Sequence, residues 1–215
     1  MMRIIKKVIR TLYAEIKTRG LYHTSIMYFS YLLSFFRAFF YKIIFLKNIS
    51  SSIFMMQSNS KIQIFNKKAK MLIGPFVFIR KNASFRIDFN GELVLGEKVF
   101  INDNCNINCV KRVVIGKQTK IGPNVSINDH DHNYKKLEDQ HLLTGDVIIG
   151  ENVWIGSNVV ILRNTTIGDN AVIAAGSIVK GFVPANSLFV HKRENEFKQF
   201  TYKDTNEMET MRDIN

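Results

Sequence analysis

The sequence predicts a mainly β protein, a parallel β-solenoid that follows an α-helical N-terminal extension. Isoleucine or valine recurs every six residues from Ile149 to Val179, and glycine follows it at Gly150, Gly156 and Gly168. Repeats of short fixed period are typical of solenoids, in which each coil buries its apolar face only by stacking on the next. The extension is indicated by basic and aromatic residues crowded before the first repeat.

The same phase appears upstream in three shorter runs. They extend from Ile73 to Phe85, from Leu95 to Ile107 and from Ile115 to Ile127, in steps of six residues with short insertions between the runs. Strand alternation alone keeps an aliphatic on one face but does not require glycine next to it. Glycine indicates a bend, where the backbone takes a positive φ or approaches a neighbour closely. Small or branched residues four places on, such as Val153 and Ser177, are expected to fill the space near the next corner.

This pattern resembles the hexapeptide-repeat acyltransferases, over roughly residues 71–190. The resemblance implies a left-handed parallel β-helix with three flat faces, and handedness is taken from the family. We expect a helical extension at 1–60, a β-helix acyltransferase domain at 61–190 with a loop at 128–146, and a charged tail at 191–215.

All of the net charge of +12 lies in the first seventy residues, which hold thirteen Lys and Arg against the single acid Glu15. Apolar residues from Val8 to Ile16 share one helical face, opposed by Lys6, Lys7 and other basic residues. Residues 26–46 are rich in aromatics but interrupted by Arg37 and Lys42, so they fall short of the ~20 apolar residues of a membrane span.

Two roles stay open for residues 1–47, capping one end of the solenoid and contact with an anionic membrane surface. Nucleic-acid binding is not expected, because no recognition motif accompanies the charge. Cys105 and Cys109 form no disulfide framework, and no secretory signal is evident. We therefore expect a cytoplasmic protein, peripheral at the inner face of the membrane if the extension binds it.

Three of the five histidines fall in the one long interruption of the repeat, between Ile127 and Ile149. Histidine suits a general base because its pKa lies near neutrality. The segment from Asp129 to His132 is similar to the loop of the sugar O-acetyltransferase branch, which implies that His130 is the base. His132 is the second candidate, and both Asp129 and His132 are expected near the acceptor.

Further roles follow only from the resemblance. Trp154 resembles an aromatic residue that lines the acceptor and pantetheine groove, and the amide of Ser157 is expected to stabilise an oxyanion. Ala175 matches a pantetheine contact, and Asn104 matches an acceptor contact, although asparagine is also common at turns for conformational reasons. Phosphate contacts are expected from three basic residues, Lys180, Lys192 and Arg193.

The function expected from this resemblance is acetyl-CoA-dependent O-acetylation of a sugar hydroxyl in capsule, exopolysaccharide or lipopolysaccharide biosynthesis. The acceptor would be a sugar or lipid-linked saccharide, and the protein a homotrimer. Alternatives are a small-molecule acetyltransferase (free sugar, serine or an antibiotic) and a non-catalytic β-solenoid. The γ-type carbonic anhydrases share the fold but bind zinc through three histidines. No third ligand accompanies His130 and His132, so no metal is expected.

Overall fold

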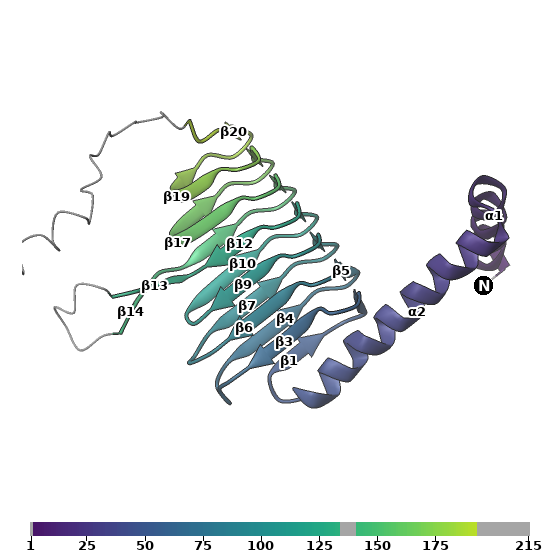
Figure 1. Cartoon of the computed structure of the whole chain (residues 1–215), viewed down its shortest axis with the longest axis horizontal. Helices are drawn as coiled ribbons and strands as arrows, with labels where there is room; N and C mark the ends of the chain where they lie inside the picture. Colours follow the sequence, from purple (N-terminus) through teal and green to yellow (C-terminus); the bar gives the residue numbers. More distant parts are fainter. Residues whose placement is uncertain (1, 134–140, 193–215) are drawn as a thin grey trace, which may run out of the picture.

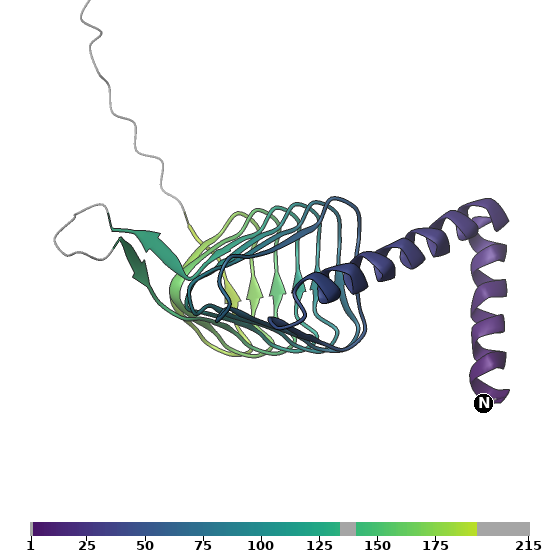
Figure 2. The ribbon, with the colours of Figure 1, turned by 90° about the horizontal axis from the view of Figure 1, so that it is seen from below.

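The computed structural model describes residues 2–133 and 141–192, with side chains from Lys6 onward. Two helices, α1 (Met2–Arg19) and α2 (Leu21–Ile44), precede a parallel β-solenoid of triangular cross-section (Figures 1 and 2). The β-solenoid predicted from the six-residue period is therefore confirmed.

The solenoid has three faces, here called A, B and C in the order in which each coil visits them. Face A contains β1 (Ile49–Ser51), β4 (Lys70–Ile73), β7 (Glu92–Leu95), β10 (Arg112–Ile115) and β15 (Val147–Ile149). Face B is a seven-stranded sheet of β2 (Phe54–Met56), β5 (Val77–Ile79), β8 (Phe100–Ile101), β11 (Lys120–Ile121), β16 (Trp154–Ile155), β18 (Val172–Ile173) and β20 (Leu188–Phe189).

Face C contains β3 (Lys61–Ile64), β6 (Ser84–Ile87), β9 (Asn106–Cys109) and β12 (Ser126–Asn128). Two longer strands, β17 (Val160–Ile167) and β19 (Ile178–Val183), run from face C round the corner onto face A. Each coil pairs in parallel with the next, so its backbone groups are satisfied by the coils on either side.

The repeat residues fill the interior. Every aliphatic or aromatic position of the six-residue series from Ile73 to Val179 is buried, and so are the residues four places on, from Val153 to Val183. The two inward-facing positions predicted from the sequence, the repeating aliphatic and the residue four places on, are thus confirmed. Burial alternates along the strands, as in the buried, half-buried, buried order of Val147–Ile149, because successive side chains point to opposite faces.

The bends do not use glycine in the expected way. Positive φ occurs mostly at asparagine, for example Asn124 (φ 58°) and Asn158 (φ 58°). The glycines that follow the aliphatics are needed for close approach: a Cβ on Gly116 would lie 2.4 Å from the carbonyl carbon of Gly150. Of the two reasons given for glycine, positive φ is wrong at these positions and close backbone approach is confirmed.

The solenoid begins earlier than residue 61. Its first coil starts at Ile49, and β1 and β2 pair with β4 and β5 of the next coil. The sequence did not reveal this coil because glycine does not follow its aliphatics, as it does in the later repeat. The helical part of the extension correspondingly ends at Ile44.

The C-terminal half of α2 covers the open end of this first coil. Ala38 is buried there, and two basic side chains donate to main-chain carbonyls, Arg37 to Met56 (3.0 Å) and Lys42 to Ser51 (2.9 Å). These carbonyls lie at the end of the solenoid, where no further coil could satisfy them. The capping role proposed for the extension is therefore observed. The rest of α2, with α1 at its far end, projects away from the solenoid (Figure 1).

Candidate functional site

All of the long insertions lie at one edge of the prism, where each coil passes from face C to face A. We call it the insertion edge; it comprises residues 65–69, 88–91, 110–111 and 129–146. The last of these contains a hairpin of β13 (His130–His132) and β14 (Leu142–Thr144), which projects from the solenoid (Figure 2). The loop expected at 128–146 is thus partly strand, and residues 134–140 lie outside the described part.

Asp129 is buried at the base of this hairpin. Its carboxylate accepts hydrogen bonds from the main-chain N–H groups of Val110 (3.0 Å) and Lys111 (2.7 Å). It also lies 2.9 Å from Nδ1 of His130. The expected contact between Asp129 and an acceptor is therefore wrong, because the side chain has no exposed surface and its oxygens already have partners.

The contact with Asp129 fixes how His130 can act. An ionised carboxylate only accepts hydrogen bonds, so this contact favours the tautomer of His130 in which Nδ1 donates and Nε2 is the accepting nitrogen. The His130 side chain is 20% exposed and lies against a surface hollow. A histidine that lines an open hollow and whose ring is oriented by a buried carboxylate is suited to general-base chemistry.

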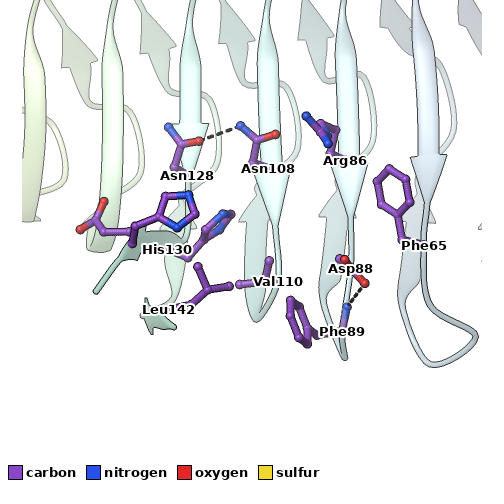
Figure 3. A pocket seen from close by; sticks show the side chains of 11 residues that line it. Phe65, Arg86, Asp88, Phe89, Asn108, Val110, Asn128, His130 and Leu142 are labelled. Carbon is purple, nitrogen blue, oxygen red and sulfur yellow. Dashed lines mark hydrogen bonds between the residues drawn. The ribbon is translucent and has the colours of Figure 1, made fainter. Parts of the chain in front are cut away.

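The hollow next to His130 has a volume of about 510 Å³ and runs along the insertion edge (Figure 3). Asparagines of neighbouring coils form part of its floor, where Nδ2 of Asn108 donates to Oδ1 of Asn128 (2.7 Å). It is further lined by Phe65, Arg86, Asp88, Phe89, Val110, Asp131, His132 and Leu142. His132 therefore lies beside His130, as expected.

An ion pair ties the hairpin to the following coil. Nε of Arg163 donates to Oδ2 of Asp131 at 2.8 Å, and the Arg163 side chain is only 19% exposed. The two ends of the hairpin segment are joined to each other by the main-chain hydrogen bond from Gly145 to the carbonyl of Asp129 (2.8 Å). Both ends of the hairpin are thus held near His130.

Asn104 lies at a different edge, between faces B and C. It belongs to a ladder of side-chain hydrogen bonds with Asn82 (3.0 Å) and Asn124 (3.1 Å) and has a positive φ of 60°. It does not line the hollow beside His130. The structure therefore explains Asn104 as a corner residue, and an acceptor contact is not supported in one protomer.

The residues expected near the thioester gather at that same B–C edge. Ser157 and Ala175 occupy successive coils there, since a Cβ on the adjoining Gly156 would lie 2.6 Å from the Ala175 nitrogen. Within the described part of the chain, the Ser157 N–H has no acceptor, so it could donate to an incoming group. Trp154 is 61% exposed on the neighbouring face B.

The basic candidates are dispersed. Lys180 is exposed at the insertion edge beyond the hairpin, and Lys192 is exposed after the last coil. Arg193 lies outside the described residues. Within one protomer, the histidines at the insertion edge and the Ser157 group at the B–C edge are separated by the whole of face C.

The two cysteines are poor candidates for a nucleophile. Both are buried and free, and burial raises the pKa of Cys105 to about 11 and raises that of Cys109 further. Among residues 2–133 and 141–192 there is no cluster of three His, Cys, Asp or Glu side chains that could hold a metal ion.

Sequence reasoning did not identify Phe65, Arg86 or Phe89 as site residues, although all three line the hollow. A signal was available, because the short insertions between the runs fall at the same point of each coil as the histidine loop. Aligning the coils by their buried positions would have placed these residues on the same edge.

Residues 146–181 match the bacterial transferase hexapeptide family model, described as six repeats. The chain is 31% identical to WbbJ of Escherichia coli, provisionally named a lipopolysaccharide biosynthesis O-acetyl transferase, over 53% of this chain and 63% of that protein. It is 38% identical to galactoside O-acetyltransferase of E. coli over 46% of this chain and 49% of that one. The matches thus span less than two thirds of either relative.

The fold is also found in AntD, an N-acyltransferase from Bacillus cereus. A structure of one of its mutants superposes with a TM-score of 0.56, covers 79% of this chain and 92% of that one, and shares 17% sequence identity. Identity at this level supports a common fold only.

Proposed function

We propose that this chain is an acetyl-CoA-dependent O-acetyltransferase. It has the six-residue repeat and carries an Asp129–His130 pair at its insertion edge. Its proposed acceptor is a sugar hydroxyl of a surface polysaccharide precursor of capsule, exopolysaccharide or lipopolysaccharide. The observation that carries the proposal is the buried carboxylate at 2.9 Å from Nδ1 of His130. The names of the E. coli relatives, both O-acetyltransferases, support transfer of an acetyl group to a hydroxyl oxygen.

In the proposed reaction, Nε2 of His130 takes the proton of the acceptor hydroxyl as its oxygen bonds to the thioester carbonyl carbon. The Asp129 carboxylate stabilises the imidazolium that forms. The carbon–sulfur bond then breaks, and His130 returns the proton to the departing sulfur. No covalent enzyme intermediate is needed, in keeping with the burial of Cys105 and Cys109.

Acetyl-CoA would supply the activated acetyl group as co-substrate. The free N–H of Ser157 supports this assignment, since an amide without an acceptor can stabilise the negative charge that develops on the carbonyl oxygen. Ala175, on the next coil, would contact the pantetheine arm. Lys180, Lys192 and Arg193 remain the proposed contacts of the coenzyme phosphates.

A homotrimer would complete the site. In one protomer, His130 and Ser157 occupy different edges of the prism, so the proton acceptor and the oxyanion donor cannot meet at one reacting carbon. If neighbouring protomers align their axes, the insertion edge of one can face the B–C edge of the next. Trp154 of that neighbour would then close the groove.

The extension would hold the enzyme at the inner face of the cytoplasmic membrane. Bulky apolar side chains of α2 are exposed, among them Phe36 (56%) and Phe40 (58%), while α1 carries Lys6, Lys7 and Arg10. Basic helices with such faces bind anionic lipid surfaces. Over the described residues, neither helix has a stretch long and apolar enough to cross a bilayer.

Titration of the full chain with acetyl-CoA and with coenzyme A tests the proposal directly. Saturable binding of both is expected, with analytical ultracentrifugation showing a trimer. Absence of binding would rule out the enzymatic function and favour a non-catalytic solenoid.

A further inference from the structure

The hollow beside His130 continues well beyond the space that one acceptor hydroxyl requires. Its floor crosses four adjacent strands of face C, with Asn128 on β12, Asn108 on β9, Arg86 on β6 and Phe65 just after β3 (Figure 3). Neighbouring strands lie about 4.8 Å apart, so three strand spacings span roughly 14 Å. This length exceeds a single sugar ring.

Two exposed aromatic rings line this groove. Phe65 is 55% exposed and Phe89 is 54% exposed, and both lie in insertions at the edge, outside the buried repeat positions. The rings therefore stabilise little of the core. Flat apolar surfaces beside polar groups suit sugar rings, whose C–H faces are apolar and whose edges carry hydroxyls.

Phe89 is held in an unusual backbone conformation, with φ at 51°. Bulky residues seldom adopt positive φ. Phe76 also has positive φ (61°), but it occupies the regular corner between faces A and B, one coil before Lys98 (φ 57°), so the repeat accounts for it. Phe89 does not occupy a corner position that recurs with positive φ from coil to coil. It is the second residue of a tight turn that the Gly91 N–H closes on the Asp88 carbonyl (2.9 Å), and this turn in the insertion places the ring at the rim of the groove.

The polar side chains of the groove keep hydrogen-bonding capacity for a ligand beyond the bond between Asn108 and Asn128. The Arg86 guanidinium lies 5.7 Å from the centroid of the Phe65 ring and forms no ion pair with any described residue. Arginine offers several fixed N–H donors, and the asparagines beside it offer both donors and acceptors. The groove thus alternates aromatic surface with hydrogen-bonding groups along its length.

We propose that this groove, from His130 to Phe65, is a subsite for an oligosaccharide acceptor of two or more sugar units. The modified ring lies at His130, and further rings stack on Phe89 and Phe65 while Arg86, Asn108 and Asn128 meet their hydroxyls. The groove runs toward the end of the solenoid that α2 covers, so an acceptor linked to lipid would extend toward the proposed membrane surface. This inference rests on the proposed acetyltransferase function and specifies its acceptor class.

The test uses the full-length chain on an array of bacterial surface glycans from one to six sugar units, with Phe65→Ala, Phe89→Ala and Phe76→Ala variants. Phe76 is the matched control, because it is also an exposed phenylalanine (60%) at positive φ but lies outside the groove. Wild type is expected to retain glycans of two or more units and not monosaccharides. Each groove variant should weaken retention about tenfold, as the loss of one ring contact permits, and Phe76→Ala should not.

The inference is overturned if no glycan is retained, if monosaccharides are retained as well as longer glycans, or if Phe76→Ala weakens retention as much as the groove variants. Titration of the same preparations with acetyl-CoA separates this failure from failure of the enzymatic proposal. Coenzyme binding without glycan length dependence removes only the oligosaccharide subsite.

Discussion

The carboxylate of Asp129 lies 2.9 Å from Nδ1 of His130 and is itself held by the main-chain N–H groups of Val110 and Lys111. One buried side chain thereby connects the hairpin to the preceding coil and orients the candidate base. Histidine could be predicted as the base from the sequence, but the positioning role of the adjacent aspartate could not, because burial is a property of the folded corner.

Replacement of Asp129 by asparagine is expected to reduce kcat about 10²–10⁴-fold, the usual contribution of a general base, because the amide no longer stabilises the imidazolium. Three donors would also share one acceptor oxygen, at a cost of about 1–3 kcal/mol in the free energy of unfolding. Steady-state kinetics and urea denaturation measure the two effects. Asp169→Asn is the control, because its carboxylate also accepts a main-chain N–H, that of Glu151 (2.7 Å), but lies at the edge between faces A and B; equal losses in both variants would refute the positioning role.

Ser157→Pro is expected to lower kcat about 10²–10³-fold with little change in acetyl-CoA affinity, since it removes one oxyanion donor. The fold should tolerate it, because the preceding coil has Pro123 at the paired position, also after glycine. Ser157→Ala keeps the amide and serves as the control. Unchanged turnover of the proline variant would exclude the amide from the reaction.

Cys105 should resist alkylation in the folded protein, reacting about a hundredfold more slowly at pH 8 than in denaturant. Burial raises its pKa from 9.0 to about 11 and so reduces the thiolate fraction. The fold favours the neutral thiol of Cys105. Its contribution to the free energy of unfolding is therefore complete below the unfolded pKa near 9.0 and is lost as the pH rises toward 11.

Iodoacetamide labelling with mass spectrometry gives the rate, and urea melts at pH 8 and pH 10.5 give the stability. Cys105→Ala should show a smaller alkaline loss than wild type. Rapid labelling of native protein at pH 8 would be inconsistent with a buried thiol.

Lys6, Lys7 and Arg10 should contribute about 1 kcal/mol each to binding of vesicles that contain phosphatidylglycerol, so their joint change to glutamine weakens binding roughly a hundredfold. Lys98, Lys117 and Lys120, which are exposed on coils farther from the end that α2 covers, provide a control with the same change in charge. Vesicle co-sedimentation measures both. High salt should release part of the wild-type protein and leave a fraction held by α2 aromatics; equal behaviour of the two variants would contradict a membrane role for α1.

The solenoid could be predicted because its core is local in sequence: every sixth residue, such as Ile155 or Ile173, points inward, and Gly116 is required where coils nearly touch. The first coil at Ile49 was missed because its aliphatics lack the following glycine. The groove was missed because Phe65 and His130 come to line one surface only after four coils have stacked. Contacts between stacked coils depend on insertion lengths, which do not follow the repeat.

The proposed reaction depends most on His130 as the base. The most direct measurement is mass spectrometry of the surface glycan from cells that lack this protein and are supplied with wild type, His130→Ala or His132→Ala at matched protein levels. We predict full O-acetylation with wild type, none with His130→Ala, a detectable fraction with His132→Ala, and acetyl-CoA binding by all three. Wild-type levels of O-acetylation with His130→Ala would contradict the account.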